Sequence, residues 1–253
     1  MRIDVFSIFP DLIRGYFSQT VASRAIRSGV FELNVVDIRT KATDAHRSVD
    51  DAPFGGGAGM LMKPEPIFAS IEDQDPPRPL FLLSPTGRKF DQGFARELSL
   101  LEGFSLICGR YEGFDARIED ELVDGAISIG DYVLAGGEVA AMAIVEATIR
   151  LLPGTLGNSH SVVEESFASS LLEYPQYTRP ADFRGLQVPE ILLGGNHKLI
   201  QEWRRTMSIV RTIRLRPDLI EKRGGLEEAE AELLTKYGYA WMVEVHTRSQ
   251  EDR

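Results

Sequence analysis

The chain has 253 residues, of which 43% are hydrophobic and 26% are charged, and its formal net charge is −10. These proportions are those of an ordinary globular protein and exclude a disordered, collagen-like or wholly coiled-coil chain. No apolar run reaches the roughly 18 residues that a membrane-spanning helix needs, so no membrane partner is expected. The single cysteine, Cys108, excludes an internal disulfide, and four scattered histidines give no zinc-site spacing. We therefore expect no structural metal and a reducing, cytoplasmic environment.

The charge is distributed unevenly. Residues 179–216 contain eight basic and three acidic residues, a local net charge of +5, whereas residues 217–253 contain five basic and nine acidic residues, a net of −4. The overall acidity argues against a nucleic-acid-binding protein, but the basic segment is where a polyanion would bind.

Apolar runs and helical patterns alternate along the first 150 residues. We expect a helix over 10–28, opened by Pro10 and ended by Gly29, because proline suits a first helical turn. Further helices are expected over 91–101, 115–122 and 138–152. The expected strands are 3–8, 31–38, 80–83, 104–108 and 126–129. This alternation predicts an α/β fold with a mostly parallel sheet covered by helices on both faces.

The pattern changes after the helix that ends at Pro153. Residues 153–180 read as a linker with one short helix, and from 181 onward only helices are expected, the clearest over 197–214. We therefore predict an α/β domain over 1–155, a linker over 156–180 and a smaller all-helical domain over 181–253. Arg204 and Arg211 are seven residues apart, which places them on one face of the helix.

Three glycine-containing segments follow predicted strands: Ser84–Arg88, Gly109–Gly113 and Gly130–Glu138. In an open parallel sheet, loops at the carboxyl ends of strands form the ligand-binding crevice, and glycine allows close backbone approach. We expect a shared cleft, although glycines after strands are also simple turns. A fourth cluster, Gly55–Gly59, lacks the strand and helix of a dinucleotide-binding turn. It is either a substrate-covering loop or a flexible loop.

Six segments of the sequence together indicate a known protein family. PFGGGAGMLMKPEP (53–66), SPTGRKFDQ (84–92), CGRYEGFD (108–115), SIGDYVLAGGE (128–138), LLEYPQYTRP (171–180) and LGGNHKLIQEWR (193–204) occur in this order. Together they closely resemble the bacterial tRNA (guanine-37-N1)-methyltransferases, the TrmD family of the SPOUT class. The resemblance implies a methyltransferase that uses S-adenosyl-L-methionine, depends on Mg²⁺, methylates the guanosine 3′ to the anticodon, and works as a homodimer with its active site at the subunit interface. It also implies a trefoil knot in the sheet, which a sequence pattern by itself does not predict.

The resemblance assigns roles to individual residues. The residues that would bind the cofactor are Leu83, Ser84, Pro85, Gly109, Tyr111, Glu112, Ile129, Gly130, Asp131, Tyr132, Val133, Leu134, Gly136 and Gly137. The sequence departs from the family at Ala140, where a proline is usual.

Methyl transfer to N1 of guanine requires a base for the N1 proton and stabilisation of the charge on O6. The resemblance places the base at Glu165, where the family usually has aspartate, with Glu164 as the alternative, and Arg150 as the residue that holds the guanine oxygen. From the sequence alone, Arg150 would form an i,i+4 ion pair with Glu146, and the glutamate pair would be solvated linker charges.

The resemblance implies that 1–155 is the cofactor-binding methyltransferase domain and that 181–253 is a tRNA-binding domain. Four further residues are expected to contact tRNA. His46 and Asp50 match family positions linked to tRNA, although lone residues of this kind are more often surface groups. Arg204 and Arg211 belong to the basic segment and suit phosphate contacts.

Two alternatives remain open at this stage. One is another SPOUT RNA methyltransferase with a different target atom. The other is a nucleotide-binding regulatory module whose helical tail docks a protein partner; it would need no carboxylate and arginine near the cleft.

Overall fold

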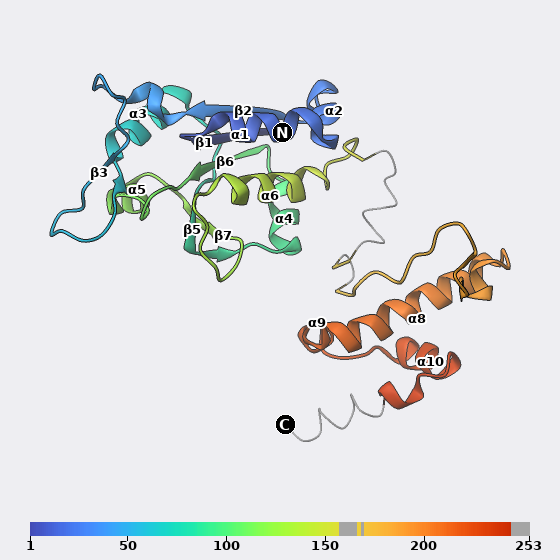
Figure 1. Cartoon of the computed structure of the whole chain (residues 1–253). Helices are drawn as coiled ribbons and strands as arrows, with labels where there is room; N and C mark the ends of the chain where they lie inside the picture. The colour runs from blue at the N-terminus through green and yellow to red at the C-terminus, as the bar shows by residue number, and fades with distance from the viewer. Residues whose placement is uncertain (157–165, 168–169, 244–253) are drawn as a thin grey trace. The chain divides into compact units, whose positions relative to one another are not determined.

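The computed structural model describes residues 1–156, 166–167 and 170–243. The chain forms two compact units, which divide between residues 159 and 160. Figure 1 shows a sheet with helices in the first unit and mainly helices in the second. Within the described part of the chain, no helix is both long and apolar enough to span a membrane.

The first unit is built on five parallel strands in the order β2-β1-β6-β5-β7. They are β1 (Arg2–Ser7), β2 (Glu32–Asp37), β5 (Leu80–Lys89), β6 (Gly103–Cys108) and β7 (Gly125–Ser128). This confirms the predicted parallel α/β sheet. β5 continues beyond the expected end at Leu83 to Lys89. Its pairing with β7 resumes at Arg88 after a shift of register that begins at Leu83. Residues 84–87 therefore form a bulge within the strand and not a turn after it.

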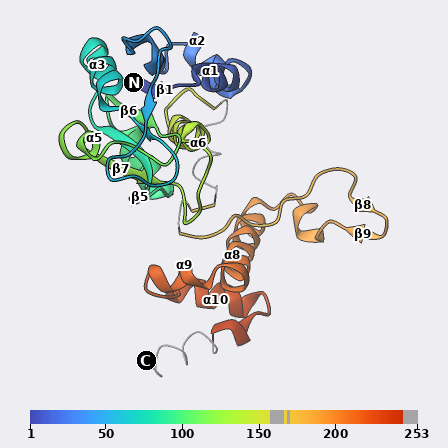
Figure 2. The same cartoon turned by 60° about the vertical axis from the view of Figure 1, so that its left-hand side comes forward.

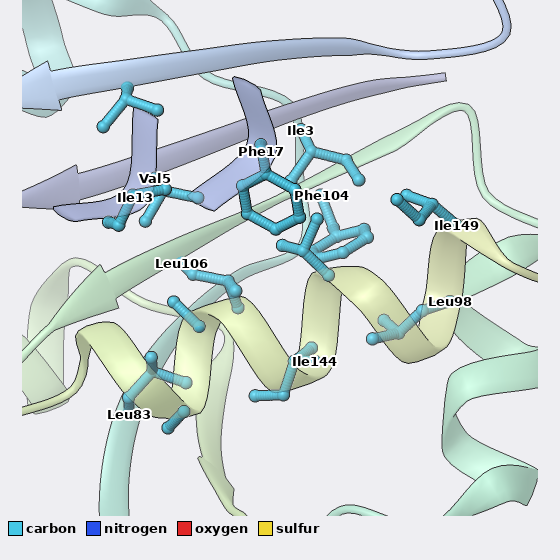
Figure 3. Packing of buried hydrophobic residues seen from close by; sticks show 14 of the residues in the cluster. Ile3, Val5, Ile13, Phe17, Leu83, Leu98, Phe104, Leu106, Ile144 and Ile149 are labelled. Atoms are coloured by element: carbon cyan, nitrogen blue, oxygen red, sulfur yellow. The ribbon is translucent and has the colours of Figure 1, made fainter. Parts of the chain in front are cut away.

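Helices cover both faces of this sheet. On one face lie α1 (Pro10–Gln19), α2 (Val21–Arg27), α4 (Gln92–Ser99) and α6 (Glu138–Ile149). On the other lie η1 (Ile38–Lys41), α3 (Pro64–Gln74) and α5 (Ala116–Glu121). Because successive strand residues point to opposite faces, Leu106 packs in the first cluster while its neighbour Ile107 packs in the second. Figure 3 shows the first cluster, with Ile144 of α6 among the strand residues.

The prediction of a single helix over 10–28 is wrong, because the helix is interrupted at Thr20, whose backbone is extended. α1 buries Ile13 and Phe17, and α2 buries Ala22 and Ala25. In one continuous helix at about 100° per residue, Ala22 would point roughly opposite to Ile13. Because the helix is interrupted at Thr20, the buried residues of α1 and α2 pack in the same apolar cluster.

Two short strands flank the glycine cluster at 55–59, and neither was predicted. β3 (Asp50–Asp51) pairs antiparallel with β4 (Leu61–Met62), and α3 follows directly at Pro64. The cluster is thus the tip of a hairpin.

The second unit contains α8 (His197–Leu215), α9 (Pro217–Lys222) and α10 (Glu228–Lys236), preceded by η2 (Glu190–Leu192). They enclose an apolar core of Leu171, Ile209, Val210, Ile220, Leu234 and Met242. The all-helical expectation is wrong, because β8 (Asp182–Phe183) and β9 (Leu186–Gln187) form a hairpin, visible in Figure 2. Arg184 and Gly185 both adopt positive φ, the backbone that a two-residue hairpin turn requires.

Candidate active site

The three predicted glycine segments contribute to one cavity of about 340 Å³, which lies at the bulge of β5 and at the carboxyl ends of β6 and β7. Its lining includes every residue expected to bind the cofactor except Asp131. Asp131 is turned to solvent, with its side chain 93% exposed and its carboxylate 3.6 Å from Lys89 Nζ. The structure therefore brings the expected residues together from the bulge of β5 and from the ends of β6 and β7.

The sequence analysis missed several residues of the cavity wall. They are Leu82, Arg110, Gly113, Phe114, Asp115, Ala116, Glu119, Ile127, Ser128, Ala135 and Ala140. Many of them lie inside the sequence segments that carry the resemblance, which was the available signal. Ala140, where the family usually has proline, is the residue of α6 that lines the cavity.

The segment 130–137 packs directly on the end of β6. The Gly137 backbone N–H donates to the Gly109 carbonyl oxygen at 2.8 Å. A side chain at Gly137 would place its Cβ 2.9 Å from Cys108 Cα, so the two backbones could not approach this closely. Glycine is needed here for space, not for an unusual φ.

A buried ionic contact joins three elements beside the cavity. The Glu138 side chain is 1% exposed and accepts hydrogen bonds from Ser7 Oγ at 2.7 Å and Arg110 Nε at 2.9 Å. Arg110 also donates to the Ala135 carbonyl oxygen and lies 4.6 Å from the centre of the Phe9 ring. The Glu138 carboxylate thus links the start of α6 to the end of β1 and the end of β6.

Cys108 lies at the base of this arrangement. It is fully buried, and burial together with the Glu138 carboxylate raises the pKa of its thiol well above the ordinary value. The thiol therefore stays protonated and is unsuited to act as a nucleophile.

The fourth glycine cluster lies against the cavity wall. The Glu112 backbone N–H donates to the Met60 carbonyl oxygen at 3.0 Å, and a side chain at Gly59 would collide with the Glu112 side chain. His46 is an exposed turn residue, and Asp50 belongs to β3 at the base of the same hairpin. Neither lines the cavity, but both belong to the segment that borders it.

The structure describes one of the two residues expected to be catalytic, Arg150, but not the other. Glu165 and its neighbour Glu164 lie outside the described residues. Arg150 is exposed and is the C-cap residue of α6, where its backbone N–H donates to the Glu146 carbonyl oxygen at 3.2 Å. At about 1.5 Å per residue, α6 separates Arg150 from Ala140, the nearest cavity residue on this helix, by roughly 15 Å, and Arg150 is not part of the lining. One chain does not place Arg150 at its own cavity.

The two arginines expected to bind phosphates differ in exposure. Arg211 is exposed on α8, whereas Arg204 is half-buried with its guanidinium carbon 4.8 Å from the centre of the Tyr174 ring. Among the described residues, no group of three or more His, Cys, Asp or Glu side chains is placed to hold a metal ion.

Comparison with known proteins identifies clear relatives. The family model described as tRNA (Guanine-1)-methyltransferase TrmD matches residues 1–222. A tRNA (guanine-N(1)-)-methyltransferase of Moorella thermoacetica is 52% identical over 227 residues, which cover 88% of this chain and 91% of the relative. Proteins of the same name from Limosilactobacillus fermentum and Geobacillus kaustophilus are 51% and 50% identical, with 87% and 88% of this chain and 90% and 92% of the relatives covered.

Proposed function

Since this chain belongs to the TrmD family of tRNA (guanine-1)-methyltransferases, we propose that it transfers a methyl group from S-adenosyl-L-methionine to N1 of guanosine 37 in tRNA. The family match over residues 1–222, which spans all three loops of the cavity, is the observation that carries this proposal.

The cavity suits the cofactor in size and chemistry. Its volume of about 340 Å³ lies in the range of small-molecule sites. Leu83, Ile129 and Leu134 would enclose the adenine, and the Glu112 and Glu119 carboxylates would attract a positively charged ligand. The bound cofactor supplies a methyl group already activated by its sulfonium charge. The chain's task is then to hold the guanine and remove its proton.

Proton removal falls to a carboxylate. N1 of guanine keeps its proton at neutral pH, so a base must take it as the methyl group arrives. We assign this role to Glu165, with Glu164 as the alternative. The Arg150 guanidinium would donate hydrogen bonds to O6, where negative charge develops.

The position of Arg150 supports a homodimer. Arg150 does not line the cavity of its own chain and lies roughly 15 Å along α6 from Ala140, the nearest lining residue on that helix, so a second copy would supply it. α1 packs against α6, and three large side chains from this region are exposed: Phe9 at 43%, Leu12 at 54% and Val139 at 57%. We propose that these residues form the subunit contact, because an exposed apolar patch is typical of an interaction surface.

Other parts of the proposal follow from the resemblance. The resemblance implies a trefoil knot in the sheet. His46, Asp50, Arg204 and Arg211 would contact tRNA, and we place the protein in the cytoplasm, where its tRNA substrate would be. The Mg²⁺ on which the family depends has no assigned ligands here.

The test is methylation of an unmodified tRNA transcript followed by identification of the modified nucleoside. We expect N1-methylguanosine at position 37 and none in a transcript with adenosine there. A different modified nucleoside would favour another SPOUT specificity. Cofactor binding without methylation of RNA would favour the regulatory module.

A further inference from the structure

A second cavity, of about 620 Å³, lies wholly within the second unit. It is formed by the segment 174–181, by residues at 188 and 192–193, and by α8. Two of the sequence segments that carry the resemblance, 171–180 and 193–204, supply most of this lining, and the proposed methyl transfer gives the cavity no role.

The lining combines three aromatic rings and two arginines with smaller apolar and polar side chains. The rings of Tyr177 and Trp203 lie 6.5 Å apart at an interplanar angle of 48°. Trp203 is 9% exposed, so it forms part of the floor, whereas Tyr177 is 49% exposed and stands at the rim. The Arg204 guanidinium lies over Tyr174, and the exposed Arg179 belongs to the same lining.

This composition matches one class of ligand. Aromatic side chains with nearby arginines bind unpaired nucleotides, because bases stack on rings while arginines attract the phosphates. The charge agrees, since residues 179–216 carry a local net charge of +5 in a chain of net charge −10. A polyanion is therefore attracted to this segment and repelled by much of the rest.

We propose that this cavity binds an unpaired nucleotide of the tRNA substrate, with the base stacked on Tyr177 and a phosphate at Arg179. The identity of the RNA as tRNA rests on the proposed function. The cofactor cavity belongs to the first unit, and we propose this second cavity as an additional contact with the tRNA.

Tryptophan fluorescence offers a direct test. The chain has two tryptophans, and Trp241 can be removed as Trp241→Phe, which leaves Trp203 as the only reporter. In this background, titration with an unmodified tRNA transcript should quench the emission saturably. Tyr177→Ala should weaken tRNA binding by about 10- to 100-fold, the effect of losing one base–aromatic stack. Tyr177→Phe should bind as the parent does.

A matched pair of charge variants distinguishes binding of tRNA in the cavity from general electrostatic attraction of tRNA to the second unit. Arg179→Gln and Lys222→Gln each remove one exposed positive charge from the second unit, but only Arg179 lines the cavity. Both variants should reduce the salt dependence of binding slightly. Only Arg179→Gln should also reduce the quenching of Trp203.

The outcomes distinguish this inference from the proposed function. If the parent makes N1-methylguanosine but Tyr177→Ala and Arg179→Gln bind tRNA as tightly as Lys222→Gln, the cavity is not a nucleotide site. Quenching by guanosine monophosphate but not by tRNA would also overturn it. If Tyr177-dependent quenching by tRNA is found without methylation, the inference stands and the proposed function fails.

Discussion

The Arg110 Nε and Nη2 atoms each lie 2.9 Å from Glu138 Oε2, although the two residues are 28 positions apart. The Glu138 side chain is 1% exposed and that of Arg110 is 23% exposed. The pair links the end of β6 to the start of α6 at the edge of the cofactor cavity, so it fixes the relative position of two cavity loops.

Removal of Arg110 should be costly. Arg110→Ala leaves the buried Glu138 carboxylate without its counter-charge, which lowers the free energy of unfolding by about 3–5 kcal/mol. Cofactor affinity should fall as well, because the loop at Ala135 loses its hydrogen bond. Urea denaturation and calorimetric titration measure the two effects.

The control is Arg88→Ala, which breaks the ion pair between Arg88 and Glu97. The side chains of both residues are 56% exposed. Its cost should stay near or below about 1 kcal/mol. The double variant Arg110→Ala, Glu138→Gln should regain part of the loss, because no unpaired charge remains buried. Equal costs for Arg110→Ala and Arg88→Ala would contradict a structural role for the buried pair.

The proposed subunit contact predicts a change of assembly. Leu12→Glu places a charge in the apolar patch of α1 and α6, so it should convert a dimer to monomers and abolish methyl transfer while leaving a folded chain. Analytical ultracentrifugation measures the assembly. Leu100→Glu is the control, because Leu100 is also exposed, at 83%, but lies just after α4, outside the patch. A Leu12→Glu protein that remains dimeric would place the contact elsewhere.

Mixed dimers test whether the active site is shared. Glu165→Ala lacks the proposed base, and Gly137→Val blocks the cofactor cavity at Cys108. If each site uses residues from both chains, a mixture with verified subunit exchange should recover part of the activity that each variant lacks. No recovery would mean that each chain builds a complete site.

The proposed base predicts a kinetic signature. Glu165→Gln keeps the shape of the side chain but cannot accept the N1 proton, so single-turnover methyl transfer should slow by about 10²- to 10⁴-fold with little change in tRNA affinity. Glu165→Asp should retain activity, and Glu164→Gln is the matched control. If Glu164→Gln is the slow variant, the base is Glu164; if neither is slow, no carboxylate of this pair takes the proton.

A buried carboxylate in the second unit predicts acid sensitivity. Burial raises the pKa of Glu230, but hydrogen bonds from Arg223 and the Glu227 backbone, with the charges of Arg223 and Arg205, outweigh burial and hold the pKa below the ordinary 4.5. A carboxyl with a lower pKa in the folded state stabilises it above the unfolded pKa, and this stability is lost as the pH falls through the folded pKa.

Glu230→Gln should therefore lower the free energy of unfolding at pH 7 by about 1–3 kcal/mol. It should also flatten the decline in stability below about pH 4.5. Glu228→Gln, an exposed change on the same helix, should do neither. Urea denaturation at a series of pH values measures both, and an unchanged slope in Glu230→Gln would mean that another group dominates the acid response.

The sequence by itself determined the elements whose signals are local. Alternating and continuous apolar runs predicted the five parallel strands, and glycine-containing segments next to three of these runs predicted one shared cavity, although the first segment is a bulge within β5. Both signals work because side-chain periodicity and the carboxyl ends of parallel strands have fixed geometric consequences. The order of the sequence motifs predicted the family, which the comparisons confirm.

The tertiary structure decided what depends on contacts distant in sequence. Ser7 and Glu138 are 131 positions apart, and no periodicity marks either as a partner of the other. The break at Thr20 follows from the direction of the core, since both segments read locally as one helix. Likewise Trp203 has the spacing of a core residue on α8, and only the fold brings Tyr177 beside it. Local patterns encode which face is apolar, but which segments meet there is set by the path of the whole chain.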